Sequence, residues 1–226
     1  IAMSFGLGKT HGQREIARLV VKRAGGKFLI VCPLGVKNQF TEEDGPRLGV
    51  HFQYVRTNEE VAAADTPFLI TNYDRVRDGD IDPSQFTGIS LDEGSVLRSL
   101  GSKTQDTFTR LCADVPFRFV CTATPSPNEY REIIYYAHFL AHMDIGQALT
   151  RWFKRDPNKA GNLTIHPHHE KTFWLWVASW ALFVNKPSDL GYSDDGYELP
   201  PLNVHWHRLP VDHTRAWGQA DNRGQH

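Results

Sequence analysis

The 226-residue sequence has few cysteines, no long hydrophobic run and no excess of charge of either sign. Its cysteines are Cys32, Cys112 and Cys121, which form no CxxC pair, so we expect no disulfide framework and a protein of the reducing cytoplasm. The longest strongly apolar stretch, Phe173 to Val184, is too short to span a bilayer, so no membrane partner is expected. Lys and Arg total 25 and Asp and Glu total 26, which excludes a global positive field but leaves a local basic track open.

What the sequence does contain is the apolar pattern of a folded α/β domain. Hydrophobic residues make up 40 % of the chain, enough for a buried core. Short apolar runs typical of buried strands alternate with segments of helical spacing. We expect strands over 27–32, 51–55, 66–71, 88–91 and 117–122, and helices over 10–23, 35–43, 59–64 and 103–113. This alternation predicts a parallel sheet that is covered by helices on both faces.

After about residue 126 the composition changes. We expect helices over 128–142, 146–154 and 171–185, a loop over 156–169 and a strand over 202–209. The last helix carries Trp174, Trp176 and Trp180, which could stack on bases. Packing is the better interpretation, because these rings belong to one broad apolar face.

The first motif with chemical meaning is the sequence GLGKT at residues 6–10, directly before the first predicted helix. Phosphate binding needs glycines, a lysine for the β- and γ-phosphates, a hydroxyl for Mg²⁺ and a helix N-terminus. All are present, although the strict pattern has glycine where Met3 stands, and a glycine-rich turn that only opens a helix is the alternative. Only a stub at residues 1–3 could form the strand that such a loop follows. We therefore expect the chain to be a piece of a longer protein.

Two further motifs follow predicted strands. Asp92 and Glu93 end one strand, where an aspartate could coordinate Mg²⁺ beside a base for a water molecule. Thr122 and Thr124 end the next strand, where two hydroxyls could relay between a nucleotide and a polymer. Each motif alone also fits an ordinary polar strand end or turn. In parallel sheets of this kind the strand ends share one edge, so together they predict a single ligand site.

In this order, the motifs resemble the first motor domain of superfamily 2 helicases, and above all the Swi/Snf-type DNA translocases and their bacteriophage relatives. The residues that carry the resemblance read AMSFGLGKT, FLIVCPLGVKNQF, LITNYD, SLDEGSVL and CTATPSPNEY. The later segments WALFVNKPSDLG and YELPPLNVHWHRL continue it along nearly the whole chain. The resemblance implies a RecA-like P-loop NTPase fold with a helical insertion, in the cytoplasm of a bacterial or phage-infected cell.

The resemblance also implies ATP and Mg²⁺ as cofactors. Lys9 would hold the β- and γ-phosphates, and Thr10 would ligate Mg²⁺. Asp92 would hold Mg²⁺ through water, and Glu93 would position or deprotonate the attacking water. The remaining loop residues would cradle phosphate: Gly6, Leu7 and Gly8.

The implied polymer is DNA, with duplex DNA favoured. Thr122 and Thr124 would couple the nucleotide state to the grip on DNA. The residues implied to contact the phosphate backbone of one strand are Pro33, Leu34, Lys37, Asn72 and Tyr73. Such backbone contacts suit a translocase because they do not depend on base sequence.

We therefore expect three regions: a RecA-like ATP-binding domain over 1–141, truncated at its N-terminus, a helical insertion over 142–198, and a connection over 199–226 toward a second RecA-like domain. That second domain would be a partner in catalysis, because nothing in this sequence resembles an arginine finger, which contributes roughly 10³–10⁵ in rate. The expected activity is DNA-dependent ATP hydrolysis that is weak for this chain alone. Gly94 and Ser95 also depart from the family, which usually has alanine and histidine there.

Several alternatives stay open. The same motifs occur in the ATPase parts of restriction or DNA-modification complexes, and the departures would also suit a catalytically weak, nucleotide-dependent DNA-binding module. A small-molecule P-loop kinase is disfavoured by the motif at Asp92. A GTPase motif over 185–189 has the wrong spacing and is expected to follow a helix rather than a strand. A metal cluster at His166, His168 and His169 has little supporting ligand chemistry.

Overall fold

The computed structural model describes residues 1–43, 49–97, 103–126, 130, 132–155, 163–197 and 203–207. The chain divides into two compact units, residues 1–193 and residues 194–226. The strands are β1 (Ala2–Met3), β2 (Phe28–Cys32), β3 (Gln53–Tyr54), β4 (Phe68–Asn72), β5 (Gly88–Asp92), β6 (Phe117–Cys121), β7 (Phe153–Arg155), β8 (Leu163–Ile165) and β9 (Phe183–Val184). The α-helices are α1 (Lys9–Ala24), α3 (Asn58–Ala63), α4 (Tyr73–Arg77), α5 (Lys103–Leu111), α6 (Glu132–Phe139), α7 (Ile145–Trp152) and α8 (Glu170–Ala178).

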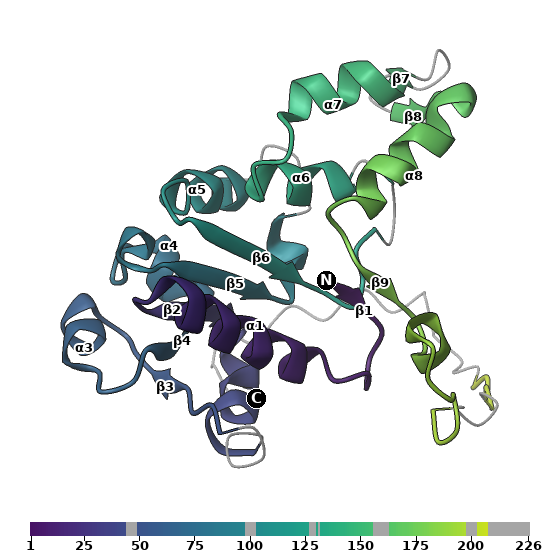
Figure 1. The fold of residues 1–226 in the computed structure, drawn as a ribbon. Helices are drawn as coiled ribbons and strands as arrows, with labels where there is room; N and C mark the ends of the chain where they lie inside the picture. The colour runs from purple at the N-terminus through teal and green to yellow at the C-terminus, as the bar shows by residue number, and fades with distance from the viewer. Residues whose placement is uncertain are drawn as a thin grey trace, which may run out of the picture. The chain divides into compact units, whose positions relative to one another are not determined.

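The centre of the first unit is a parallel sheet of five strands in the order β3-β4-β2-β5-β6 (Figure 1). The short strand β1 extends it, because Ala2 pairs with Thr122 just beyond β6. On its other side β1 pairs in parallel with β9. The predicted parallel α/β fold is confirmed, and the phosphate loop does follow a strand, which is two residues long.

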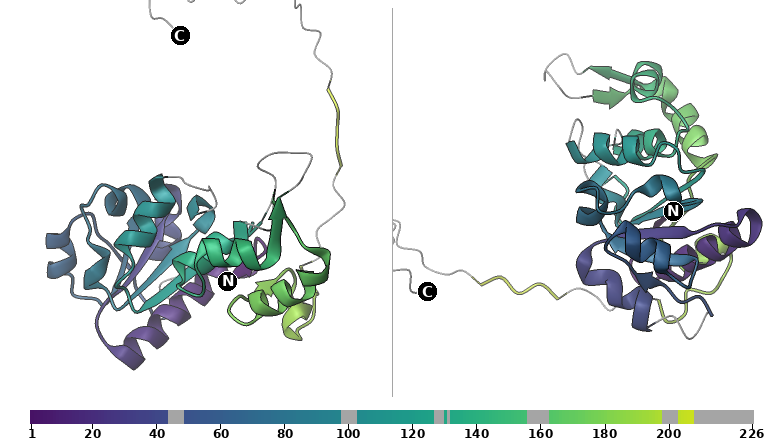
Figure 2. Two further views of the ribbon diagram at one scale, coloured as in Figure 1. Left: turned by 90° about the horizontal axis from the view of Figure 1, so that it is seen from above. Right: turned by 90° about the vertical axis from the view of Figure 1, so that its left-hand side faces the viewer.

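Both faces of the sheet are covered because its central strand, β2, is apolar on both sides. On β2, Leu29 and Val31 belong to a cluster with buried residues of α3, α4 and α5. Phe28 and Ile30 belong to a second cluster with Ala17 of α1. Successive strand side chains point to opposite faces, so one run of apolar residues serves both layers. Figure 2 shows α1 on one face of the sheet, with α4 and α5 on the other.

Side chains between residues 133 and 181 form a third apolar cluster. Its fully buried members include Ile134, Trp152, Phe173 and Val177. The Trp152 and Trp176 rings stack with centroids 4.5 Å apart. The three tryptophans of the predicted last helix, Trp174, Trp176 and Trp180, all pack against this cluster, which confirms the packing interpretation.

Four predictions for residues 146–209 differ from the structure. The predicted loop over 156–169 contains β8, which pairs antiparallel with β7 through Phe153 and Ile165, and β7 also shortens the helix predicted over 146–154. The helix predicted over 171–185 ends at Ala178, where the Ser179 hydroxyl donates to the Trp176 carbonyl at 2.6 Å, and β9 follows. The strand predicted over 202–209 is absent from its described part, 203–207.

The sequence predicts no segment that spans a membrane. No helix in the described ranges is both long and apolar enough to cross a membrane. The three-region division at residues 141 and 198 stays a prediction.

Candidate nucleotide-binding site

A cavity of about 420 Å³ opens where α1 begins, at the carboxyl edge of the sheet. Residues of the first two predicted motifs, the glycine loop and the acidic pair, line the same cavity. The residues that line it are Ser4, Phe5, Gly6, Gly8, Lys9, Thr10, His11, Pro33, Val36, Gln39, Asp92 and Glu93.

The loop before α1 depends on its glycines for its shape. Gly6 and Gly8 have φ angles of 80° and 82°, in the left-handed region that side chains disfavour. Gly8 is the residue just before α1, so its conformation directs the chain into the helix, which begins at Lys9. Leu7, between the two glycines, is half-buried. The loop therefore presents the Lys9 and Thr10 side chains and the N-terminus of a 16-residue helix to the cavity.

The acidic pair lies across the cavity from this loop. Asp92 is the last residue of β5, and Glu93 adopts a left-handed conformation with φ of 52°. A Cβ atom on Gly94 would lie 2.3 Å from Cγ1 of Val120, so the tight turn leaves no room for alanine. The Glu93 carboxylate is thereby directed to 4.0 Å from the Lys9 ammonium.

The Asp92 carboxylate is held in a buried, polar environment. It is 6 % exposed and accepts a hydrogen bond of 2.7 Å from Nε2 of Gln13. Burial raises the pKa of Asp92, while the Gln13 hydrogen bond and the nearby Lys9 charge act in the opposite direction. The Tyr73 hydroxyl donates to the Asp92 carbonyl at 2.7 Å and fixes the backbone at the same point. A carboxylate oxygen in such a place is the kind of ligand that Mg²⁺ takes.

The third predicted motif also contacts this site. The Thr122 hydroxyl donates to Oε1 of Glu93 at 3.2 Å, and the Thr124 backbone N–H donates to the Thr122 hydroxyl at 3.1 Å. Lys9, Glu93, Thr122 and Thr124 therefore form one continuous chain of contacts from the phosphate loop to the end of β6. Ser95, at the family's histidine position, donates from its hydroxyl to the Glu93 carbonyl at 3.3 Å.

The residues predicted to contact DNA lie beside the same sheet edge in two groups. In the segment after β2, Pro33 lines the cavity and Leu34 is 57 % exposed. The Lys37 ammonium lies over the ring of Tyr54, 5.0 Å from its centroid. These side chains form a half-open surface next to the nucleotide cavity.

The second group is engaged inside the protein. The Asn72 amide oxygen accepts from the Tyr54 hydroxyl at 3.3 Å, and its nitrogen donates to Asp74 at 3.5 Å. Tyr73 packs edge-on against Phe108, 5.3 Å between centroids. Burial, with Asp92 close by, raises the pKa of Tyr73 well above its usual value. A DNA contact by either residue stays a prediction.

Two further polar residues, Gln13 and Ser90, belong to the site and are not among the predicted ones. Both are fully buried, and the Ser90 hydroxyl donates to Oε1 of Gln13 at 2.7 Å. The signal that could have found Gln13 is its spacing: it stands four residues after Lys9, on the same side of α1. Ser90 stands two residues before Asp92 and so points to the same face of the sheet.

The segment over 185–189 is closed by local hydrogen bonds. Asp189 accepts hydrogen bonds from the backbone N–H groups of Asn185 and Lys186 at 2.7 and 3.2 Å. This segment follows β9, so the expectation that it follows a helix is wrong. His166, His168 and His169 have ring centroids 4.2 to 5.7 Å apart. Within the described ranges, no group of three or more His, Cys, Asp or Glu residues could hold a metal ion.

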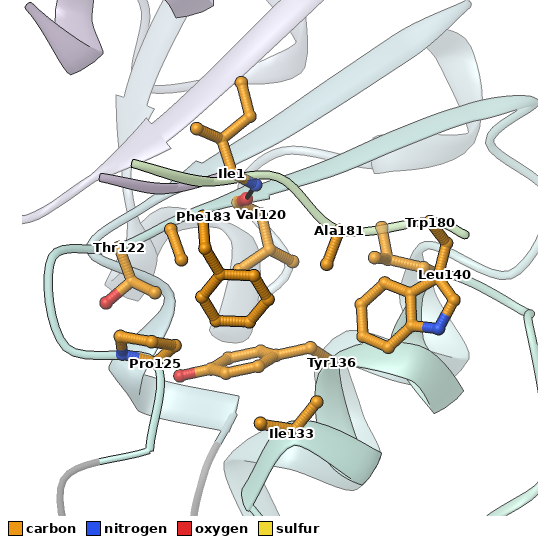
Figure 3. Close-up of a pocket in the computed structure, with 11 residues that line it drawn as sticks. Ile1, Val120, Thr122, Pro125, Ile133, Tyr136, Leu140, Trp180, Ala181 and Phe183 are labelled. Atoms are coloured by element: carbon orange, nitrogen blue, oxygen red, sulfur yellow. Dashed lines mark hydrogen bonds between the residues drawn. The ribbon is translucent and has the colours of Figure 1, made fainter. Parts of the chain in front are cut away.

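A second, much smaller cavity of about 40 Å³ lies behind Thr122, between β6, α6 and β9. Figure 3 shows the Phe183 ring above Tyr136, with Thr122 and Pro125 on one side and Trp180 on the other. Its walls are mostly apolar and it could hold about one water molecule, so it is no nucleotide site.

No protein-family model and no curated protein matches the chain. Among solved structures, the Sulfolobus solfataricus SWI2/SNF2 ATPase core in complex with dsDNA is similar over 85 % of this chain, with a TM-score of 0.63 and 19 % identity. A second structure of the Sulfolobus solfataricus SWI2/SNF2 ATPase core domain is similar over 82 %, with a TM-score of 0.61 and 18 % identity. The chain spans 41 % and 38 % of these two solved chains. It therefore has the fold of a SWI2/SNF2 ATPase core over less than half of that core's length, which is the fold that its motifs predict.

Proposed function

We propose that this chain is the ATP-binding half of an ATP-dependent DNA translocase or helicase of superfamily 2, related to the Swi/Snf type. The observation that carries the proposal is the chain of contacts from Lys9 through Glu93 to Thr122, in a cavity that a glycine loop and a helix N-terminus help to line. A turn that only opened a helix would not need a glutamate directed at its lysine and a threonine bonded to that glutamate.

In this proposal the loop binds the phosphates of ATP. Gly6 and Gly8 allow backbone N–H groups to face the anion. Lys9 is the first residue of α1, and the helix dipole also favours negative charge at this N-terminus. The cavity volume of about 420 Å³ lies within the range typical of small-molecule sites, roughly 300–1,000 Å³.

The donor set fits Mg²⁺. The Thr10 hydroxyl and the Asp92 carboxylate both line the cavity, and Asp92 would hold the ion through water. When bound, Mg²⁺ neutralises charge on the phosphates. Glu93 is the base that positions or deprotonates the attacking water, because its carboxylate faces the cavity beside Lys9.

Coupling to DNA follows from the position of Glu93. Thr122 contacts Glu93 directly, so a movement of this carboxylate on hydrolysis would also move Thr122, at the end of β6. On the DNA side, Lys37 and Leu34 lie in the segment that begins at Pro33, which itself lines the nucleotide cavity. Backbone phosphates would be the groups that Lys37 contacts.

We also propose that turnover needs a second RecA-like domain. Within the described part of the chain, no arginine lines the cavity, so no group present can act as the arginine that stabilises phosphoryl transfer. The chain alone would bind ATP and hydrolyse it slowly.

The test is duplex DNA binding by fluorescence anisotropy, with and without a non-hydrolysable ATP analogue and Mg²⁺. We expect the analogue to change the affinity, and Lys37→Ala to weaken binding at every DNA sequence and reduce its salt dependence. Lys22→Ala, which removes a lysine from the far end of α1, is the matched control and should leave affinity unchanged. Equal DNA affinity for both variants and no effect of nucleotide would contradict the proposal.

A second candidate function, a nucleotide-dependent DNA-binding module that does not cycle, is favoured by Ser95 at the family's histidine position. Single-turnover hydrolysis with duplex DNA separates the two candidates. A slow rate that Glu93→Gln abolishes supports a motor half, whereas no hydrolysis above the Glu93→Gln background supports the binding module.

A further inference from the structure

A buried hydrogen-bonded network lies directly behind the acidic pair, and none of the proposed roles uses it. Gln13, on α1, is fully buried and has a hydrogen bond at each end of its amide group. Its Nε2 donates to Oδ1 of Asp92 at 2.7 Å, and its Oε1 accepts from the Ser90 hydroxyl at 2.7 Å. The amide therefore joins two residues of β5 to the helix that carries Lys9.

The network has a defined direction. An ionised Asp92 can only accept, so the Gln13 amide must present its nitrogen there and its oxygen to Ser90. Ser90 then donates its single hydroxyl hydrogen to Oε1 of Gln13. The Cys121 sulfur, 3.8 Å from the Ser90 oxygen, is consequently the donor in that contact. Every member thus has a partner, and a rotated amide would place two oxygen atoms against each other at Asp92.

This arrangement constrains the Asp92 carboxylate, which lines the cavity at the end of β5. Asp92 is 6 % exposed, so little of its side chain reaches solvent. With one oxygen held by Gln13, the carboxylate can turn only as far as α1 allows. Its remaining lone pairs are thereby presented to the cavity beside Lys9 and Thr10.

We infer that Gln13 is a positioning residue that orients the Asp92 carboxylate for Mg²⁺, and that Ser90 fixes the orientation of Gln13. The inference rests on the proposed nucleotide function. It adds two residues outside the glycine loop and the acidic pair. Groups that orient a metal ligand in this way typically change metal affinity about 10–100-fold when they are removed.

The experiment measures ATP-analogue binding to the full chain by calorimetry, once in EDTA and once across a Mg²⁺ titration. Mn²⁺ electron paramagnetic resonance supplies a direct count of bound metal. Gln13→Met keeps the length of the side chain and removes both hydrogen bonds. We expect its affinity in EDTA to equal that of the wild type, and its Mg²⁺ affinity in the presence of nucleotide to fall about 10–100-fold.

A general packing defect is controlled by Gln105→Met, the same change at another buried glutamine, on α5 and therefore on the opposite face of the sheet. This control should retain the wild-type Mg²⁺ affinity. Ser90→Ala removes the hydroxyl that donates to Oε1 of Gln13, so the Gln13 amide can still donate to Asp92 but is free to rotate. This variant should therefore lower the Mg²⁺ affinity by a smaller factor than Gln13→Met does. If Gln13→Met does not fold, Ser90→Ala decides the question.

Unchanged Mg²⁺ affinity in a folded Gln13→Met, or in Ser90→Ala where the first variant does not fold, overturns the inference and leaves the nucleotide site intact. A wild-type chain that binds nucleotide without any dependence on Mg²⁺ also overturns it. A wild-type chain that binds no nucleotide in either condition overturns the proposed function, and with it the inference that rests on that function.

Discussion

The backbone at Glu93 makes a prediction that separates function from stability. Its φ of 52° lies in the left-handed region, which costs a residue with a Cβ roughly 1–2 kcal/mol. Asparagine adopts this conformation more readily than other residues with side chains. Glu93→Asn should therefore recover about 1 kcal/mol of that strain.

The matched control is Glu93→Gln, which also removes the charge and the 4.0 Å ion pair with Lys9 but leaves the strain. In thermal unfolding followed by circular dichroism, Glu93→Asn should melt about 2–4 °C above Glu93→Gln, because 1 kcal/mol corresponds to that shift in a chain of this size. Both variants should lack hydrolysis. If Glu93→Asn melts at or below the Glu93→Gln midpoint, the strain assigned to this turn is refuted.

Three further predictions concern stability. Burial raises the pKa of Asp92, so the folded state binds the carboxyl proton more tightly than the unfolded state does. The stability that this group contributes is therefore present at low pH and is lost as the pH rises through the folded pKa. In a series of thermal melts, Asp92→Asn should melt above the wild type at pH 7, by an amount that shrinks toward pH 4. Phe173→Ala removes a fully buried ring from the third apolar cluster and should cost about 3–5 kcal/mol in urea unfolding, whereas a cost under 1 kcal/mol would contradict the packing described. Ala141 has φ of 58° just after α6, so Ala141→Gly should raise the unfolding free energy by about 0.5–1 kcal/mol, and a loss would contradict it.

Much of the first unit could be predicted because its strands are short and mostly apolar. Runs such as residues 28–32 can be buried only between two layers, and their alternation with helical segments leaves few arrangements. Parallel strands also end at one edge of the sheet, so the sequence predicts that the three motifs lie together there, and Lys9, Glu93 and Thr122 do meet at that edge.

The errors have physical causes. The hairpin of β7 and β8 has three-residue strands, too short for a recognisable alternation, and its stability comes from contacts such as Phe153 with Phe173. Strand β9 is two residues long and exists because β1 provides its hydrogen-bonding partner. Pairing between such distant segments leaves no local signal in the sequence.

The network behind Asp92 was missed for a different reason. Gln13 lies in a predicted helix whose polar residues are mostly at the surface, and its burial follows only from the position of β5 beneath α1. The left-handed turn at Glu93 was also hidden, since the glycine that marks such a turn stands one position later, at Gly94.

Calorimetry with the full chain would show whether the loop at the start of α1 binds Mg²⁺·ATP. We expect saturable binding by the wild type, loss of that binding in Lys9→Ala, and unchanged binding in Lys22→Ala, which removes a lysine from the last turn of the same helix. Equal binding by Lys9→Ala and the wild type, or no binding by the wild type, would contradict it.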